Sequence, residues 1–262
     1  MKEFFGWGGY TRPADGFLSW QHLTFVTALM VIMVTMAIII GLINRKKDMR
    51  AKNRVLMVSA LLIDGFELFK IVILCLRESD PWLWRYELPL FLCSIQLIVI
   101  PLAAFSKGWL KDSALDFVLI FGILGAVLGT YGAGNNYGTY PVLGFDNVVS
   151  GITHTIAGFS SIYIAVSGMK SMKPRNIPVC FGILFGFCSG AAIANKILDY
   201  NYMFLVRGDG TPYDVLFALV NGNPILYSLG VILLFVLYIS AFYGVYFLIK
   251  ALIRATRERS RA

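Results

Sequence analysis

The sequence predicts an all-α polytopic membrane protein with seven transmembrane helices, and both its composition and its apolar patterning indicate this class. Of its 262 residues, 58% are hydrophobic and only 15% are charged, so the chain is too apolar for an ordinary water-soluble domain. A bilayer core about 30 Å thick needs roughly 20 apolar residues per helix, and seven such runs occupy nearly the whole chain. We therefore expect residues 1–262 to form a single transmembrane domain.

The seven predicted helices follow from the length of each apolar run. We place them at about 23–43, 54–76, 88–105, 114–131, 149–169, 177–199 and 225–249. Two of them carry stripes of small residues, which allow helix backbones to approach closely. These residues are Gly122, Gly125, Gly129 and Gly132 in the fourth helix, and Gly182, Gly186, Gly190 and Ala194 in the sixth. The stripes predict tight packing inside the bundle, with a dimer interface as the alternative.

The distribution of Lys and Arg predicts the orientation of the chain. One set of loops holds Arg45, Lys46, Lys47, Arg50, Lys52, Arg54, Lys107, Lys111, Lys170, Lys173, Arg175, Lys250, Arg254, Arg257, Arg259 and Arg261. The opposite loops hold only Lys2, Arg12, Arg77, Arg85 and Arg207. The positive-inside rule then places the N-terminus outside and the C-terminus in the cytoplasm. We expect a multi-pass protein of the plasma membrane, of bacterial origin.

The partners that the charge predicts are membrane lipids. The net charge of +8 comes from cations beside helix ends, where topology and anionic lipid head groups account for them, so nucleic acid is not expected as a partner. No metal-type Cys cluster is present, and neither a metal nor another cofactor is expected. The four cysteines are not a disulfide framework, although a Cys75–Cys93 bridge is an open alternative. The oligomeric state is not predicted.

Polar residues at membrane depth are the informative ones, because an unpaired charge in hydrocarbon costs several kcal/mol. The second helix carries Asp64, Glu67 and Lys70, spaced so that they lie on one side of the helix and can pair along it. Other polar residues at this depth are Gln96, Asn195, Lys196 and Asp199. They predict either a self-neutralising network that stabilises the bundle or a polar cavity that opens toward the outer leaflet.

Cys93 and His154 form the sharpest candidate pair. Each lies about five residues below the outer end of its predicted helix, which is roughly 7 or 8 Å at 1.5 Å per residue, so the two share a depth. A neutral imidazole can activate a neighbouring thiol as a nucleophile. The alternative is that Cys93 is a small buried apolar residue and His154 a packed core histidine.

Three motifs resemble the YwaF-like family of seven-helix membrane proteins. They are Leu88-Pro89-Leu90-Phe91-Leu92-Cys93, His154, and Asn201-Tyr202-Met203-Phe204-Leu205. This family is related to an animal membrane acyltransferase that moves a fatty acyl chain between phospholipids. The resemblance implies that Cys93 and His154 correspond to the Cys and His of that enzyme. The usual motif reads Leu-Pro-Leu-His-Leu-Cys, so Phe91 replaces a second candidate base.

The resemblance implies two-step acyl transfer in which Cys93 attacks a lipid ester and His154 takes its proton. Candidate donors to the oxyanion are Asn195 and Gln96, and Glu67 or Asp199 could orient the imidazole. The apolar stretch 211–220 is expected to lie at the interface as a lid.

The alternative function is a small-molecule transporter or binding protein with an intramembrane charged pathway. Its pathway residues would be Asp64, Glu67, Lys70, Lys196 and Asp199. A seven-helix receptor ranks behind both, because the last helix carries no retinal-type lysine.

Overall fold

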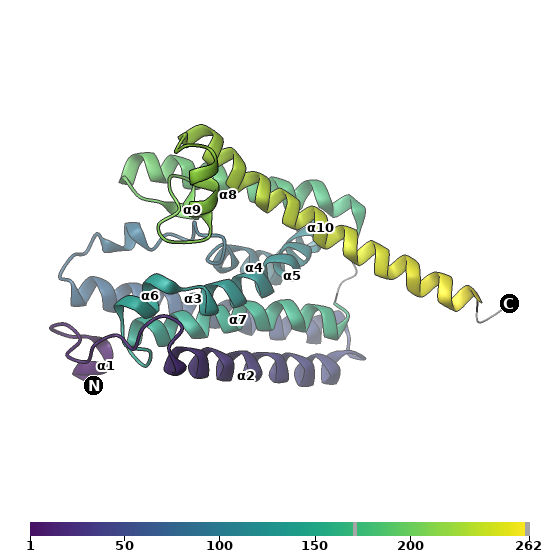
Figure 1. The fold of residues 1–262 in the computed structure, drawn as a ribbon. Helices are drawn as coiled ribbons and strands as arrows, with labels where there is room; N and C mark the ends of the chain where they lie inside the picture. The colour runs from purple at the N-terminus through teal and green to yellow at the C-terminus, as the bar shows by residue number, and fades with distance from the viewer. Residues whose placement is uncertain (170–171, 260–262) are drawn as a thin grey trace.

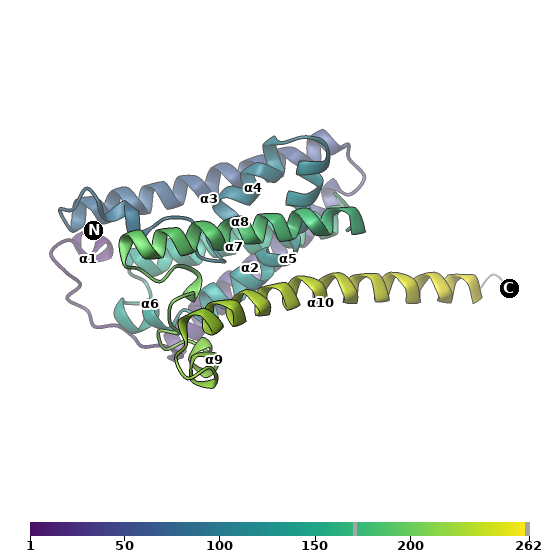
Figure 2. The same ribbon diagram turned by 90° about the horizontal axis from the view of Figure 1, so that it is seen from above.

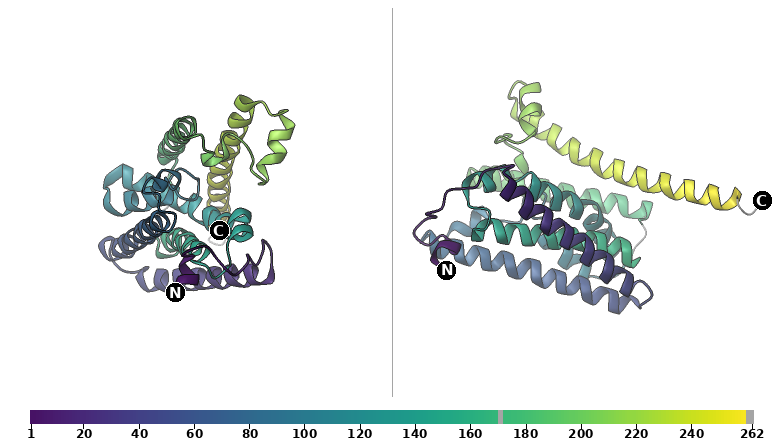
Figure 3. Two further views of the ribbon diagram at one scale, coloured as in Figure 1. Left: turned by 90° about the vertical axis from the view of Figure 1, so that its left-hand side faces the viewer. Right: turned by 60° about the horizontal axis from the view of Figure 1, so that its bottom comes forward.

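A computed structural model describes residues 1–169 and 172–259, and the regular structure of these residues is helical throughout (Figure 1). The long helices are α2 (Trp20–Asn44), α3 (Met49–Arg77), α5 (Gly108–Tyr131), α7 (Phe145–Ser167), α8 (Ile177–Leu198) and α10 (Pro224–Arg259). The shorter ones are α1 (Lys2–Phe5), α4 (Gln96–Phe105), α6 (Gly134–Thr139), α9 (Tyr213–Leu219) and the 3-10 helices η1 (Leu83–Tyr86), η2 (Pro174–Asn176) and η3 (Tyr202–Phe204). The left panel of Figure 3 views the bundle from the end at which the N-terminus lies. The predicted all-α class is confirmed for these residues.

Five helical stretches in the described part of the chain are long and apolar enough to cross a membrane. They are Trp20–Asn44, Gly108–Thr139, Phe145–Ser167, Pro174–Leu198 and Pro224–Thr256. Each overlaps one predicted span. A long apolar run in lipid forms a helix because a helix pairs its backbone N–H and C=O groups within the segment. Helix α3 covers the predicted span 54–76, but its charged residues set it apart from these five.

The predicted helix 88–105 is only partly helical, because α4 begins at Gln96. Pro89 has no N–H and disfavours a helical conformation of the residue before it. The Ser94 hydroxyl then competes for the backbone: it accepts from the Phe91 N–H at 2.9 Å and donates to the Phe91 carbonyl at 3.1 Å. Residues 88–95 therefore form an irregular turn, and the 10-residue helix α4 rises only roughly 15 Å. Because residues 88–105 are mostly apolar, the length of the apolar run did not predict this break.

Helices α5 and α7 pack closely through the small residues of α5, as predicted for that stripe. A Cβ added at Gly122 would lie 2.7 Å from both the Ala157 carbonyl oxygen and the Ser161 Cβ. The Ser161 hydroxyl crosses the interface and donates to the Leu119 carbonyl at 2.7 Å. Small residues and interhelical hydrogen bonds are the interactions that join helices in lipid, where apolar side chains gain little from helix contact.

The small residues of α8 behave differently, and the prediction that they pack tightly is wrong for two of them. A Cβ added at Gly182 or Gly186 would meet no atom within 4 Å. Helix α10 extends beyond the bundle. It has 36 residues, rises roughly 54 Å, and projects past the other helices (Figure 2). It is joined to α5 by side chains, such as Tyr238, whose hydroxyl donates to the Ile120 carbonyl at 3.1 Å.

A buried ion pair ties the N-terminal segment to the bundle. Arg77 at the end of α3 donates to both carboxylate oxygens of Asp146 at the start of α7, at 2.7 and 3.0 Å. The Tyr10 hydroxyl donates to the same carboxylate at 2.6 Å. The two charged side chains are only 7% and 9% exposed. A bidentate pair at this burial positions the ends of α3 and α7 and holds residues 1–19 against them.

Replacing Asp146 with Ala should lower the free energy of unfolding by about 3 kcal/mol, because the buried Arg77 guanidinium loses its bidentate partner. Thermal unfolding in detergent measures the change. The matched control is Arg12→Ala, which breaks the Arg12–Asp15 pair; Arg12 is 53% exposed, so a loss of no more than about 1 kcal/mol is expected. Equal effects of the two substitutions would contradict the assignment of Asp146 as a buried tie.

Candidate functional site

The structure brings Cys93 and His154 to the same face of α5. A Cβ added at Gly125 would lie 3.4 Å from the Cα and 3.5 Å from the Cβ of Cys93. A Cβ added at Gly129 would overlap the imidazole ring of His154. Positions four apart on a helix are neighbours about 5–6 Å apart. The turn that carries Cys93 and the α7 helix that carries His154 therefore meet within one turn of α5, and both side chains are half-buried.

Cys93 lies in the irregular turn just before α4, not inside a helix. The backbone N–H groups of Cys93 and Ser94 lie in this turn, outside the regular hydrogen bonding of α4. Such groups are hydrogen-bond donors that a regular helix would use internally, and they favour negative charge at the sulfur or on an oxygen bound next to it. The break in the helix thus exposes backbone donors at the candidate nucleophile.

A three-member ion cluster lies beside this pair. The Lys70 ammonium is 2.7 Å from Glu67 on the same helix and 3.0 Å from Glu87, which follows η1. The predicted pairing of Glu67 with Lys70 along α3 is therefore confirmed. Lys70 is within electrostatic range of both Cys93 and His154. Glu87 was missed from the sequence, where it stands in a loop and belongs to no helical spacing pattern.

Gln96 is the most unusual polar residue near the turn. It begins α4 three residues after Cys93, and its side chain is fully buried. Within the described residues neither its amide nitrogen nor its amide oxygen has a hydrogen-bond partner. Buried amides are nearly always bonded, so an unpartnered one next to a candidate nucleophile is a group available to a ligand.

A model of the TMEM164 family matches residues 17–243. The chain belongs to the TMEM164 family. The matched range includes Cys93, His154 and the glycine face of α5. Neither a curated protein nor a solved structure matches the chain. The family match and the apolar helices together show a membrane protein of the TMEM164 family. The resemblance to the YwaF-like family stays a prediction.

In this TMEM164-family protein the polar residues of α8 do not join the Cys93 site. Asn195 donates to the Tyr202 carbonyl at 3.1 Å and accepts from the Tyr202 N–H at 2.6 Å, so its amide holds the segment after α8. Lys196 and Asp199 are exposed. Asp64 is half-buried on α3, one turn before Glu67. Of the predicted set, Glu67, Lys70 and Gln96 thus accompany Cys93 and His154.

Phe91, at the position where the sequence resemblance predicts a His, packs in an aromatic cluster. Its ring centroid is 5.2 Å from that of Tyr202, 5.7 Å from Phe204 and 6.3 Å from Tyr200. The Tyr202 hydroxyl also donates to the Arg85 carbonyl at 2.6 Å. In this TMEM164-family chain, position 91 anchors the Cys93 turn to the segment after α8.

The predicted lid contains the short helix α9, whose first residue reaches the site. Tyr213 interacts electrostatically with Cys93, and its ring stacks on Phe204 at 5.7 Å. Burial raises the pKa of Tyr213, and Cys93 adds to this shift. Val215 and Leu219 on the same helix are 66% and 75% exposed. An exposed apolar face beside a half-buried Tyr suits a helix that lies at the membrane interface.

The cysteines carry no disulfide in the structure. All four cysteines are free, so the Cys75–Cys93 disulfide considered from the sequence is not formed. No group of three or more His, Cys, Asp or Glu side chains that could hold a metal ion occurs among the residues that the structure describes.

Gly129→Ala should displace His154, because the new methyl group would occupy the space of its imidazole ring. Overpacking of this kind costs about 1–3 kcal/mol, which thermal unfolding should register as a lower midpoint. Gly65→Ala on α3 is the matched control, since a Cβ there meets nothing within 4 Å. That control should be neutral or stabilising by about 0.5–1 kcal/mol. A Gly129→Ala midpoint at or above that of the control would contradict the close approach of His154.

Proposed function

We propose that this TMEM164-family protein is a membrane-embedded lipid acyltransferase that uses Cys93 as nucleophile and His154 as base. The observation that carries the proposal is the meeting of the Cys93 turn and His154 over one turn of α5. The membrane supplies both partners of the reaction, a phospholipid as acyl donor and a lysolipid or amine as acceptor.

In the first half-reaction, the Cys93 sulfur attacks the carbonyl carbon of a phospholipid ester, and the thiol proton passes to the His154 imidazole. The tetrahedral oxyanion accepts hydrogen bonds from the Cys93 and Ser94 N–H groups and from the Gln96 amide. The ester C–O bond then breaks, and the lysolipid oxygen leaves with the proton held by His154. An acyl-thioester remains on Cys93.

In the second half-reaction, the acceptor hydroxyl or amine gives its proton to His154 and attacks the thioester carbon. The C–S bond breaks, and His154 returns the proton to sulfur. Glu67 and Glu87 hold the Lys70 ammonium in place beside the site. No oxidant, metal or further co-reactant is needed.

The same proposal includes seven membrane spans, with α3 and the turn that leads into α4 completing the five apolar helices. The paired Lys70 cluster and the half-buried turn support this, because charges and irregular backbone enter the hydrocarbon only where protein covers them. The N-terminus lies outside, the C-terminus lies in the cytoplasm of a bacterial cell, and the site lies in the outer half of the plasma membrane. The excess of Lys and Arg in the loops of one side supports this orientation.

The runner-up is a transporter, favoured by one specific observation. Helix α4 is a half-length helix that follows an irregular segment beside Glu67, Lys70 and Glu87. Discontinuous helices next to charged residues are the usual substrate sites of secondary transporters. A transporter should tolerate Cys93→Ala and lose function on Glu67→Gln.

Purified protein in nanodiscs with labelled phospholipid should form a hydroxylamine-sensitive thioester on Cys93, detected by mass spectrometry. Cys93→Ala should abolish the adduct, and His154→Ala should slow its formation by about 10²–10⁴-fold. Cys75→Ala, which removes another half-buried free thiol, should leave the adduct at its normal rate. No adduct from any of a broad panel of phospholipids would refute the acyltransferase and favour the transporter.

Gln96→Leu should separate activity from stability. Loss of an oxyanion donor should slow thioester formation by about 10²–10³-fold. The thermal midpoint should nevertheless stay the same or rise, because the substitution removes a buried amide that has no hydrogen-bond partner in the described residues. Asn195→Leu is the control: it breaks two hydrogen bonds to Tyr202 and should lower the midpoint. A lower midpoint with normal thioester formation for Gln96→Leu would show a structural role instead.

A further inference from the structure

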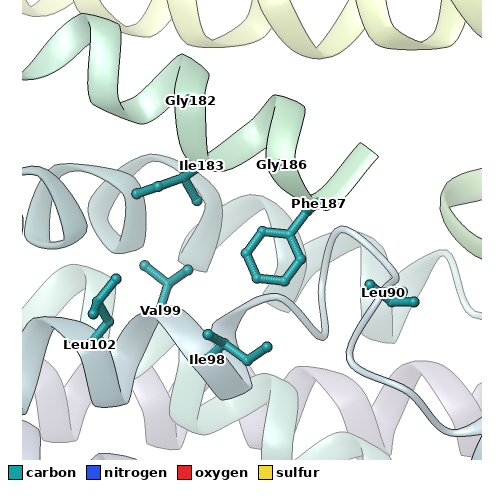
Figure 4. Close-up of a pocket in the computed structure, with 8 residues that line it drawn as sticks. All are labelled: Leu90, Ile98, Val99, Leu102, Gly182, Ile183, Gly186 and Phe187. Atoms are coloured by element: carbon teal, nitrogen blue, oxygen red, sulfur yellow. The ribbon is translucent and has the colours of Figure 1, made fainter. Parts of the chain in front are cut away.

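An apolar groove of about 390 Å³ lies between α4 and α8 (Figure 4). It is lined by Leu90, Ile98, Val99, Leu102, Gly182, Ile183, Gly186 and Phe187. Its volume falls within the roughly 300–1,000 Å³ typical of small-molecule sites. Such sites usually add a few polar groups to an apolar lining, whereas these eight side chains offer no charge, hydroxyl or amide. The lining therefore suits hydrocarbon alone.

Two glycines keep this groove open. A Cβ at Gly182 or Gly186 would meet no atom within 4 Å, so the space opposite these residues is not filled by the neighbouring helix. One turn further, at Gly190, the Leu90 side chain closes the gap, with its Cδ2 3.6 Å from an added Cβ. The groove thus narrows at the turn that carries Cys93 and stays open along the length of α4.

One end of the groove is formed by the turn that carries the candidate nucleophile. Leu90 lines its end and stands three residues before Cys93, while Leu102 lines it two turns along α4 from Gln96. A chain lying in the groove would therefore run away from the thiol, parallel to α4. This is the arrangement that an ester needs if its carbonyl is to reach a nucleophile at the polar end while its hydrocarbon stays in an apolar channel.

We propose that this groove binds the fatty acyl chain of the donor phospholipid and presents its ester carbonyl to Cys93. The inference rests on the proposed acyltransferase function and adds the part of the substrate that is selected. The occupant is a lipid chain because the lining is apolar, the surrounding solvent is hydrocarbon and Leu90 at one end of the groove belongs to the turn that carries Cys93. The distance from Cys93 to the far end of the groove then determines which acyl chain lengths fit.

The test fills the groove without disturbing the fold. The variant Gly182→Leu/Gly186→Leu places two side chains in open space, and Gly244→Leu on α10, where an added Cβ also meets nothing, is the matched control. Thioester formation on Cys93 is measured with two phospholipid donors, one with palmitoyl and one with butanoyl chains. The double variant should lose at least about tenfold with palmitoyl and keep its rate with butanoyl, since misfit in an apolar pocket discriminates on this scale. The control should match wild type with both.

Unchanged rates with both donors, or equal losses with both, would overturn the groove assignment while leaving the acyltransferase in place. If wild type forms no thioester at all, the acyltransferase fails, and the groove is judged by a phospholipid with a photoactivatable acyl chain. Cross-links to α4 and α8 that disappear in the double variant would support chain binding. Two outcomes would overturn the groove assignment: cross-links spread evenly over the lipid-facing helices, or a cross-link that joins α8 of one copy of the chain to α8 of another.

Discussion

The close approach of α7 and the Cys93 turn to one side of α5 depends on the absence of side chains there. Gly122 admits the α7 backbone, Gly125 admits the Cys93 turn and Gly129 admits the His154 ring. In lipid, helices gain little from burying apolar side chains against each other, so backbone proximity and dispersion contacts determine which helices join. The same glycines that pack α7 onto α5 therefore also bring the Cys93 turn and the His154 ring to neighbouring positions on α5.

An irregular turn at this position needs other groups to satisfy and enclose its backbone, because hydrocarbon offers none. Ser94 bonds Phe91 within the turn, and Phe91 packs on Tyr202. Tyr202 is held in turn by Asn195, which accepts its N–H and donates to its carbonyl. The segment after α8 is thus a support for the Cys93 turn. Glu67 and Glu87 pair with the Lys70 ammonium, which would otherwise be expelled toward water.

Apolar run length was enough to predict the all-α class and five spans, because it decides whether a segment leaves water. Run length could not detect the turn at 88–95, because that segment is as apolar as the predicted spans. Pro89 and Ser94 were the local signals that the helix breaks there. Equal depth brought Cys93 and His154 into consideration, but their meeting depends on Gly125 and Gly129, which is tertiary information. Glu87 was missed for the same reason, since its partner Lys70 lies on another element.

The two glycine stripes look alike in the sequence but differ in the structure, and the residues opposite them explain the difference. Gly122 faces Ala157 and Ser161, whose small side chains allow the helices to close. Gly182 and Gly186 share their groove with Ile98, Leu102 and Phe187, which hold α4 and α8 apart. A soluble protein would collapse such a gap to bury it. In a bilayer the gap is already in contact with hydrocarbon, so it can persist as a channel without the penalty that an empty apolar cavity carries in a soluble core.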